Sequence, residues 1–229
     1  MSRRYALYFA PAADSPLARF GEFVLGRTAE TARNDSASST FPDKARWLEL
    51  TRSPAHYGFH ATLKAPFELS DTHNLSELII RVEEFADSHD AVPLPGLKPR
   101  PIAHFAALTL ENQPEALRNL AQSVVESFES FRRPLSSSDI QRRKAQPLSA
   151  RQIELLEQFG YPYVDEEFRF HMTLSGALTE QNQDYIHWLQ DSYQQQVNDT
   201  PLLDQLAIYG QTSRSAAFVR LCSYPLKTH

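Results

Sequence analysis

Apolar residues recur every three to four positions in several segments of the chain, and this spacing predicts amphipathic helices. The clearest example has one apolar face made of Leu75, Leu78, Ile79, Val82 and Phe85. Ser149 and Gln152 have the spacing of an N-terminal capping box, and Gly160 stands where a C-terminal cap belongs. We therefore expect helices at 17–25, 44–51, 75–85, 117–128, 149–160 and 185–197.

Shorter segments rich in aromatic and β-branched residues predict strands. They lie at 5–10, 57–67, 102–110, 167–176, 203–210 and 216–224. Four prolines between 93 and 101 restrict that segment to an edge strand or a loop. Residues 28–42 and 134–147 are polar and show no periodicity, so we expect a surface loop and a polar connector there.

Two of the predicted strands repeat one motif. The heptapeptide YGFHATL at 57–63 aligns without gaps with FRFHMTL at 168–174, and Phe, His, Thr and Leu are identical. A predicted helix precedes each motif, and an amphipathic helix and two strands follow it. This pattern predicts an internal duplication around 57–110 and 168–225.

The predicted fold class is α+β, with two pseudo-symmetric lobes of antiparallel sheet and outer helices. Each lobe gives one His-x-Thr strand to a central cleft. We expect a single bilobal domain over 1–229 in which the lobes mix N- and C-terminal segments. The oligomeric state is left open.

Alternation along a strand places residues two apart on the same face. His60 and Thr62 therefore share a face with Gly58 and Lys64, and His171 and Thr173 share one with Arg169 and Ser175. The intervening apolar residues face a core. These are Phe59, Ala61, Leu63, Phe168, Phe170, Met172 and Leu174.

This combination of side chains suits cleavage of a phosphodiester. Two imidazoles, His60 and His171, supply a general base and a general acid near neutral pH. The hydroxyls of Thr62 and Thr173 donate hydrogen bonds to the non-bridging phosphate oxygens. Lys64 and Arg169 are candidates for added electrostatic stabilisation, and Tyr5, Tyr57 and Tyr163 for substrate contact or packing. Tyr8 is a candidate of the same kind as these three tyrosines. The other six histidines show no comparable motif, and we interpret them as ordinary residues.

Composition and absent motifs narrow the alternatives. The net charge of −5 favours a small ligand over long nucleic acid, and the single cysteine excludes an intrachain disulfide. The chain has no His-Glu-x-x-His, P-loop or Gly-x-Ser-x-Gly sequence, so we expect no metal and no other cofactor. It also has no apolar run of membrane-spanning length and no secretory signal after Met1, which indicates a cytoplasmic protein without membrane contact. The basic run Arg142-Arg143-Lys144 is either a solvated helix face or a cap on the cleft.

Four segments carry a family resemblance: YALYFAP at 5–11, YGFHATLKAPF at 57–67, GYPY at 160–163 and FRFHMTLSG at 168–176. They resemble the two-histidine (2H) phosphoesterase superfamily, which includes RNA 2′,3′-cyclic phosphodiesterases and 2′-5′ RNA ligase-like proteins. The nearest resemblance is to a branch encoded among bacterial phosphonate-metabolism genes. The resemblance implies a catalytic pair at His60 and His171 and phosphate-contacting hydroxyls at Thr62 and Thr173.

The resemblance also implies a substrate class. We expect a metal-independent phosphodiesterase that hydrolyses a cyclic phosphate, or a related phosphodiester, of a small phosphorylated sugar in phosphonate breakdown. Two alternatives stay open: a 2′,3′-cyclic phosphodiesterase acting on RNA ends, and a phosphate-ligand binding protein without turnover.

Overall fold

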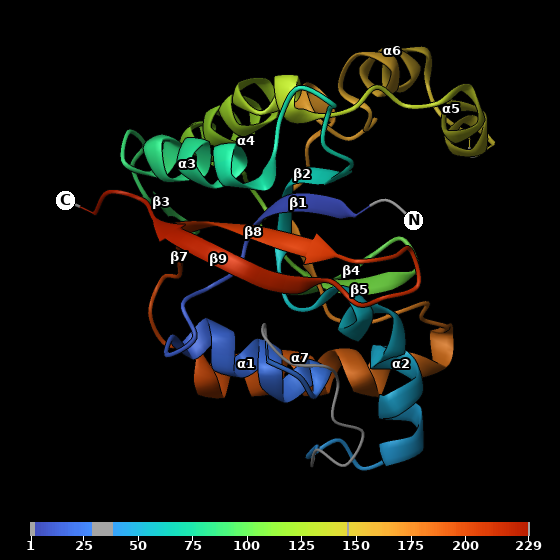
Figure 1. Ribbon diagram of the computed structural model, residues 1–229. Helices are drawn as coiled ribbons and strands as arrows, with labels where there is room; N and C mark the ends of the chain where they lie inside the picture. Colours follow the sequence, from blue (N-terminus) through green and yellow to red (C-terminus); the bar gives the residue numbers. More distant parts are fainter. Residues whose placement is uncertain (1–2, 29–38, 146, 229) are drawn as a thin grey trace.

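The computed structural model describes residues 3–28, 39–145 and 147–228 (Figure 1). Most of the surface loop predicted at 28–42 lies outside the described residues. The helices are α1 (Pro16–Leu25), α2 (Lys44–Tyr57), α3 (Leu75–Ala86), α4 (Glu115–Ser127), α5 (Ser137–Lys144), α6 (Ala150–Phe159) and α7 (Gln183–Gln196). Three short 3₁₀ helices lie at Glu129–Phe131, Asp165–Glu167 and Glu180–Asn182.

Within the described residues, seven strands form one antiparallel sheet in the order β4-β5-β6-β2-β1-β8-β9. Their bounds are β1 (Arg4–Phe9), β2 (Ala61–Phe67), β4 (Lys98–Ile102), β5 (Phe105–Thr109), β6 (His171–Thr173), β8 (Gln205–Gln211) and β9 (Val219–Pro225). A second, two-stranded sheet pairs β3 (Val92–Pro93) with β7 (Leu202–Leu203). Ala61 of β2 pairs with Met172 of β6, so the two His-x-Thr segments lie side by side in the sheet.

The sheet divides at the β2–β6 pair into two lobes. The first lobe contains β2, β1, β8 and β9, with α3 and α4 packed against it. The second contains β6, β5 and β4, covered by α7 and, beside it, α1. Figure 1 shows the two helix pairs on opposite sides of the strands. The prediction of an α+β fold with two pseudo-symmetric lobes and outer helices is thus confirmed, with one continuous sheet joining the lobes.

The two motif segments have the same order of elements. β2 is followed by α3, β3, β4 and β5, and β6 is followed by α7, β7, β8 and β9. The terminal hairpin of each segment belongs to the lobe that holds the other segment's motif strand. The internal duplication itself stays a prediction.

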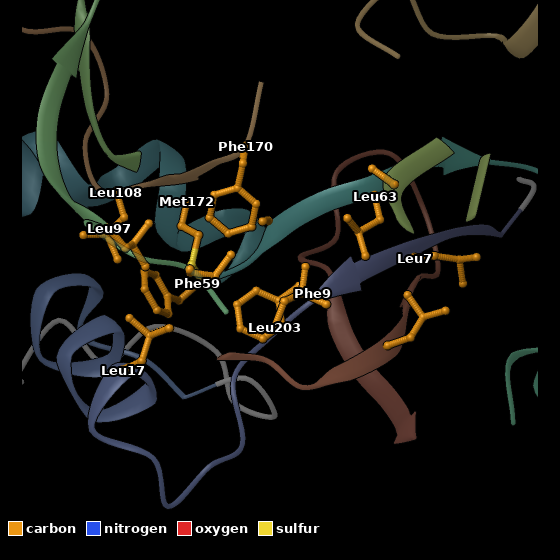
Figure 2. Close-up of a cluster of buried hydrophobic side chains, with 14 of the residues drawn as sticks. Leu7, Phe9, Leu17, Phe59, Leu63, Leu97, Leu108, Phe170, Met172 and Leu203 are labelled. Atoms are coloured by element: carbon orange, nitrogen blue, oxygen red, sulfur yellow. The ribbon is translucent and has the colours of Figure 1, made fainter. Parts of the chain in front are cut away.

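One face of the sheet builds the main core together with α1, α3, α4 and α7. Phe59, Leu63, Phe170 and Met172 all belong to this core, and Figure 2 shows Phe59 close to Met172 and Phe170, with Leu63 further along β2. Each of these four side chains is at most 7% exposed. Full burial of such a side chain contributes about 1.5–3 kcal/mol, so these apolar positions anchor both motif strands and leave their polar positions to the opposite face.

Three predicted segments differ from the structure. Helix α2 continues through Pro54 to Tyr57, so Tyr57 and Gly58 precede the strand that was predicted to begin there. Pro54 has no N–H group to donate to the helix, so the sequence predicted that the helix ends before it. The connector predicted at 134–147 contains α5, whose described side chains include none that is buried, so no apolar stripe announces it. Strand β6 is also shorter than predicted.

Among the described residues, no helix is both long enough and apolar enough to cross a lipid bilayer.

Candidate active site

The two motif histidines are held in the same way by the backbone that precedes them. Nδ1 of His60 lies 2.9 Å from the carbonyl oxygen of Gly58, and Nδ1 of His171 lies 2.8 Å from that of Arg169. A carbonyl oxygen only accepts, so Nδ1 carries the proton in both rings. In the neutral form Nε2 then holds the lone pair, which makes each ring able to take a proton at Nε2 or to return one.

Gly58 has a backbone conformation that favours glycine, with φ of +82° at the C-terminal cap of α2. The buried guanidinium of Arg27 lies beside it and donates to the carbonyls of Ala55 and Phe218, at 2.6 and 3.1 Å. The hydrogen bonds of Arg27 therefore hold in place the turn whose Gly58 carbonyl contacts His60.

A cleft of about 550 Å³ lies on the polar face of the sheet. Its lining includes His60 and Thr62 from the first motif and Thr173 from the second. The Thr62 hydroxyl lies 3.4 Å from Nε2 of His60, so these two groups face the same part of the cleft. His171 does not itself line this cleft, but its ring lies 6.2 Å from that of Phe105, which does.

The surroundings of His60 favour its neutral form. Tyr8 is fully buried on β1, and its ring stacks on the imidazole at 3.7 Å with an interplanar angle of 15°. Burial, with smaller contributions from the charges of His171 and Arg27, lowers the pKa of His60 from 6.5 to about 4, against the opposing hydrogen bond to Gly58. His60 therefore carries no charge at neutral pH.

The prediction that Lys64 lies on the face of His60 is wrong. Tyr8 pairs with Thr62 but Leu7 pairs with Lys64, so a β-bulge shifts the register between these two positions. The bulge turns Lys64 to the core face, where it is 3% exposed. Its ammonium group donates to the Val125 carbonyl and pairs with Glu129, both at 2.9 Å.

Three further candidates lie away from the cleft. The Arg169 guanidinium is exposed and donates to the carbonyls of Glu166 and Phe168, at 2.7 and 2.9 Å. Tyr5 is 6% exposed and packs in the main core, because it lies on the opposite face of β1 from Tyr8. Tyr163 is exposed and does not line the cleft, and its ring lies 5.4 Å from that of Tyr161, which does. Of the four candidate tyrosines, Tyr8 and Tyr57 line the cleft.

Sequence reasoning missed several residues of the cleft: Arg4, Ser53, His104, Phe105 and Tyr161. His104 follows Ala103, a non-glycine residue with φ of +49°, in the hairpin between β4 and β5. Of these positions, only Tyr161 could have been suggested by the sequence, because it lies in the GYPY segment with the candidate Tyr163. The others come from distant segments: Arg4 from β1, Ser53 from α2, and His104 and Phe105 from the β4–β5 hairpin.

Among the described residues, no group of three or more His, Cys, Asp or Glu side chains is placed to hold a metal ion.

The structure thus places two His-x-Thr segments side by side in one antiparallel sheet, with both imidazoles fixed through Nδ1. At the level of the family, a model described as "Protein of unknown function (DUF1045)" matches residues 62–219, and the chain belongs to this family.

Two curated relatives share the name "Ribose 1,5-bisphosphate phosphokinase PhnN". The protein from Janthinobacterium sp. (strain Marseille) is 36% identical over 223 residues, which are 94% of this chain and 49% of the relative. The protein from Laribacter hongkongensis (strain HLHK9) is 31% identical over 177 residues, which are 77% of this chain and 41% of the relative. The chain thus spans about half the length of the curated relatives it matches.

Two solved structures align with the whole chain over their own whole length. They are E. coli LigT complexed with 3'-AMP, with 11% identity and a TM-score of 0.44, and a phosphoesterase, with 12% identity and a TM-score of 0.43.

Proposed function

We propose that the protein is a metal-independent phosphodiesterase that hydrolyses a cyclic phosphate, or a related phosphodiester, of a small phosphorylated sugar. The observation that carries this proposal is the matched pair of hydrogen bonds from Nδ1 of His60 and His171 to the carbonyls two residues earlier. A structural histidine needs no such arrangement, but a general base and a general acid both do, because each must present Nε2 to the reacting group.

The two histidines take different roles in this proposal. His60 is neutral at pH 7 because burial lowers its pKa to about 4, so it accepts the proton of the attacking water. The water oxygen forms a bond to phosphorus while the bond to the leaving sugar oxygen breaks, and His171, which enters the step as the imidazolium, gives its Nε2 proton to that oxygen. Thr62 and Thr173 donate to the non-bridging oxygens, where the negative charge develops. Exchange with solvent then restores the protons of both rings.

The substrate class rests on weaker support. The relatives' shared name contains a phosphorylated ribose, and the sequence resembles a branch encoded among phosphonate-metabolism genes. The kinase activity in that name is not transferred, since the chain covers about half of each relative and has no P-loop sequence. We therefore propose that the protein hydrolyses a cyclic sugar phosphate during phosphonate breakdown, and that it does so in the cytoplasm.

The test is hydrolysis of a defined panel by the purified protein in EDTA. The panel holds a 2′,3′-cyclic nucleotide, a ribose 1,2-cyclic phosphate and a short RNA with a 2′,3′-cyclic end. We expect turnover of the sugar phosphate, and a loss of about 10²–10⁴-fold or more in His60→Ala and in His171→Ala. His187→Ala is the matched control, because His187 is exposed on α7 and does not line the cleft.

Four results would contradict the proposal. Near-normal turnover in either motif variant would show that the two histidines are not the acid and the base. Dependence of turnover on an added divalent metal would show that the mechanism is metal-dependent. Preference for the RNA would move the substrate to RNA ends. Binding without hydrolysis of any member would favour a phosphate-ligand binding protein.

A further inference from the structure

Each motif histidine is held by a backbone carbonyl, and the backbone around each of these carbonyls is held by one side chain from a distant segment. Arg27 lies shortly after α1 and contacts the turn before His60. Gln113 lies shortly before α4 and contacts the segment before His171. Neither side chain belongs to a motif or lines the cleft. Both histidines are therefore supported from outside the cleft.

Two backbone carbonyls from different elements accept hydrogen bonds from the Arg27 guanidinium. Nη1 donates to Ala55, near the C-terminal end of α2, at 2.6 Å, and Nη2 donates to Phe218, just before β9, at 3.1 Å. Carbonyls in the last turn of a helix have no partner within the helix, so an outside donor satisfies one of them here. Arg27 is 4% exposed, and its planar fork fixes the two carbonyls relative to each other.

Gly58 connects this anchored helix end to the first motif. Its φ of +82° and ψ of 174° form a combination that is essentially restricted to glycine, and such a conformation persists only where its surroundings hold it. The guanidinium carbon of Arg27 lies 3.7 Å from the place where a Cβ atom of residue 58 would be. Arg27 therefore packs against the turn that directs the Gly58 carbonyl to Nδ1 of His60, at 2.9 Å.

Gln113 supports the second motif through the same peptide unit that holds its histidine. Its Nε2 donates to the carbonyl of Phe168, at 3.1 Å, and its Oε1 accepts from the N–H of Phe170. The N–H of Phe170 and the carbonyl of Arg169 belong to one planar peptide unit and point in opposite directions. Gln113 thus binds one edge of this unit, and Nδ1 of His171 binds the other edge, at 2.8 Å.

We propose that Arg27 and Gln113 are a matched pair of positioning residues, Arg27 for His60 and Gln113 for His171, which keep the proton on Nδ1 and direct Nε2 to the substrate. A ring whose Nδ1 loses its carbonyl partner can rotate and can carry its proton on either nitrogen. The effect on turnover rests on the proposed function, whereas the effect on the proton position does not.

The first measurement locates the proton on each ring. Nitrogen chemical shifts of His60 and His171 in alkaline buffer show whether Nδ1 or Nε2 is protonated. We expect Nδ1–H in both rings of the wild type. Arg27→Met should move His60 toward Nε2–H and leave His171 unchanged, and Gln113→Leu should do the reverse. General damage to the fold would alter both rings, so this crossed pattern is specific to positioning.

The second measurement is turnover of the cyclic sugar phosphate. Arg27→Met and Gln113→Leu should each lower kcat about 10- to 100-fold, because small displacements of a reacting group are costly, and should change KM little. Gln113→Glu keeps the acceptor for the Phe170 N–H and loses the donor to Phe168, so it should recover much of the rate. Arg27→Lys keeps the charge without the planar fork and should give an intermediate rate.

Two variants provide matched controls elsewhere in the molecule. Lys64→Met removes another buried cation, on the core face of β2, and is the control for Arg27→Met. Gln190→Leu removes another hydrogen bond from a side-chain amide to a carbonyl, that of Pro99 at 3.3 Å, and is the control for Gln113→Leu. Neither control should change the proton position of a motif histidine or lower kcat.

The melting temperature of each variant shows whether the fold is kept. If Arg27→Met does not fold, Gly58→Ala tests the same connection, because alanine does not adopt the glycine conformation and the carbonyl must turn. The proton position should then change in His60 alone.

Unchanged proton positions in the folded Arg27 and Gln113 variants would overturn the proposal, and so would equal changes of both rings in either variant. A crossed change with an unchanged kcat would also overturn it, because positioning would then have no effect on the reaction. If the wild type hydrolyses no member of the panel, the proposed function fails. The crossed change of proton positions would still support the two positioning residues in that case.

Discussion

Backbone carbonyls decide which nitrogen each motif histidine offers to a substrate. Gly58 and Arg169 hold Nδ1 of His60 and His171 at 2.9 and 2.8 Å, although one residue caps a helix and the other lies in an irregular segment. The sequence spacing predicted the shared face of each His and Thr, but not these carbonyl partners. Their positions depend on φ and ψ of the preceding turn, which residue types alone do not specify.

The environment of His60 predicts an unusual acid limb in the pH profile. A general base must be neutral, and His60 becomes protonated only as the pH falls toward about 4. We therefore expect kcat/KM to stay high between about pH 7 and 5 and to fall below that, whereas an ordinary histidine would lose activity near pH 6.5. Rates from pH 4 to 9 and a histidine NMR titration measure this.

Tyr8 provides the control for this pH prediction. Tyr8→Phe keeps the buried ring that stacks on His60, so the acid limb should not move. Tyr8→Ala uncovers the imidazole, so its pKa and the acid limb should rise toward 6.5. An acid limb near pH 6.5 in the wild type would show that His60 is not the base, or is not protected by burial.

The threonine hydroxyls predict a loss that appears in kcat. Thr62→Val and Thr173→Val keep the strand shape and remove one donor to the developing charge, so each should lower kcat about 10²-fold with a smaller change in KM. Thr62→Ser and Thr173→Ser retain the hydroxyl and should recover most of the rate. An equal loss in the valine and serine variants would assign these residues to packing only.

At the scale of elements, periodic segments were predictable and irregularities were not. Alternation placed Phe59, Leu63, Phe170 and Met172 correctly in the core, because a one-residue shift would expose them all. The bulge after Thr62 carries no sequence signature, and it removed Lys64 from the site. Helix α5 has no buried face among its described residues, so apolar spacing could not reveal it.

The bulge predicts that Lys64 takes no part in catalysis. Lys64→Met removes a buried charge and leaves Glu129 paired with Arg132, so activity should be kept and stability should change little. Glu129→Ala instead leaves the Lys64 ammonium buried without its carboxylate and should lower the free energy of unfolding by about 3–5 kcal/mol. Urea unfolding and turnover of both variants measure the asymmetry. A folded but inactive Lys64→Met protein would return Lys64 to the site.

At the scale of the whole molecule, the cleft and a second cavity, which Arg4 and Arg214 help to line, both depend on residues from distant segments. Arg4 and Arg214 are brought together because β1 and β8 are neighbours in the sheet, and the His-x-Thr segments meet because β2 and β6 are. The motif repeat predicted that the two His-x-Thr segments meet, since it gave two equivalent strands. Nothing in the sequence predicted that Arg4 and Arg214 lie close together, because they belong to no motif.

The continuous sheet predicts that the two lobes unfold together. Leu108 of β5 in the second lobe and Ile208 of β8 in the first are both fully buried in one core cluster that joins the lobes. Leu108→Ala and Ile208→Ala should each cost about 2–5 kcal/mol and lower the melting temperature by about 5–15 °C. Because the lobes share the β2–β6 pair, each variant should still give a single transition by calorimetry, coincident with the loss of near-UV circular dichroism. Two separate transitions, with only one of them shifted in each variant, would show that the lobes fold independently and that the cleft between them is held by the β2–β6 contact alone.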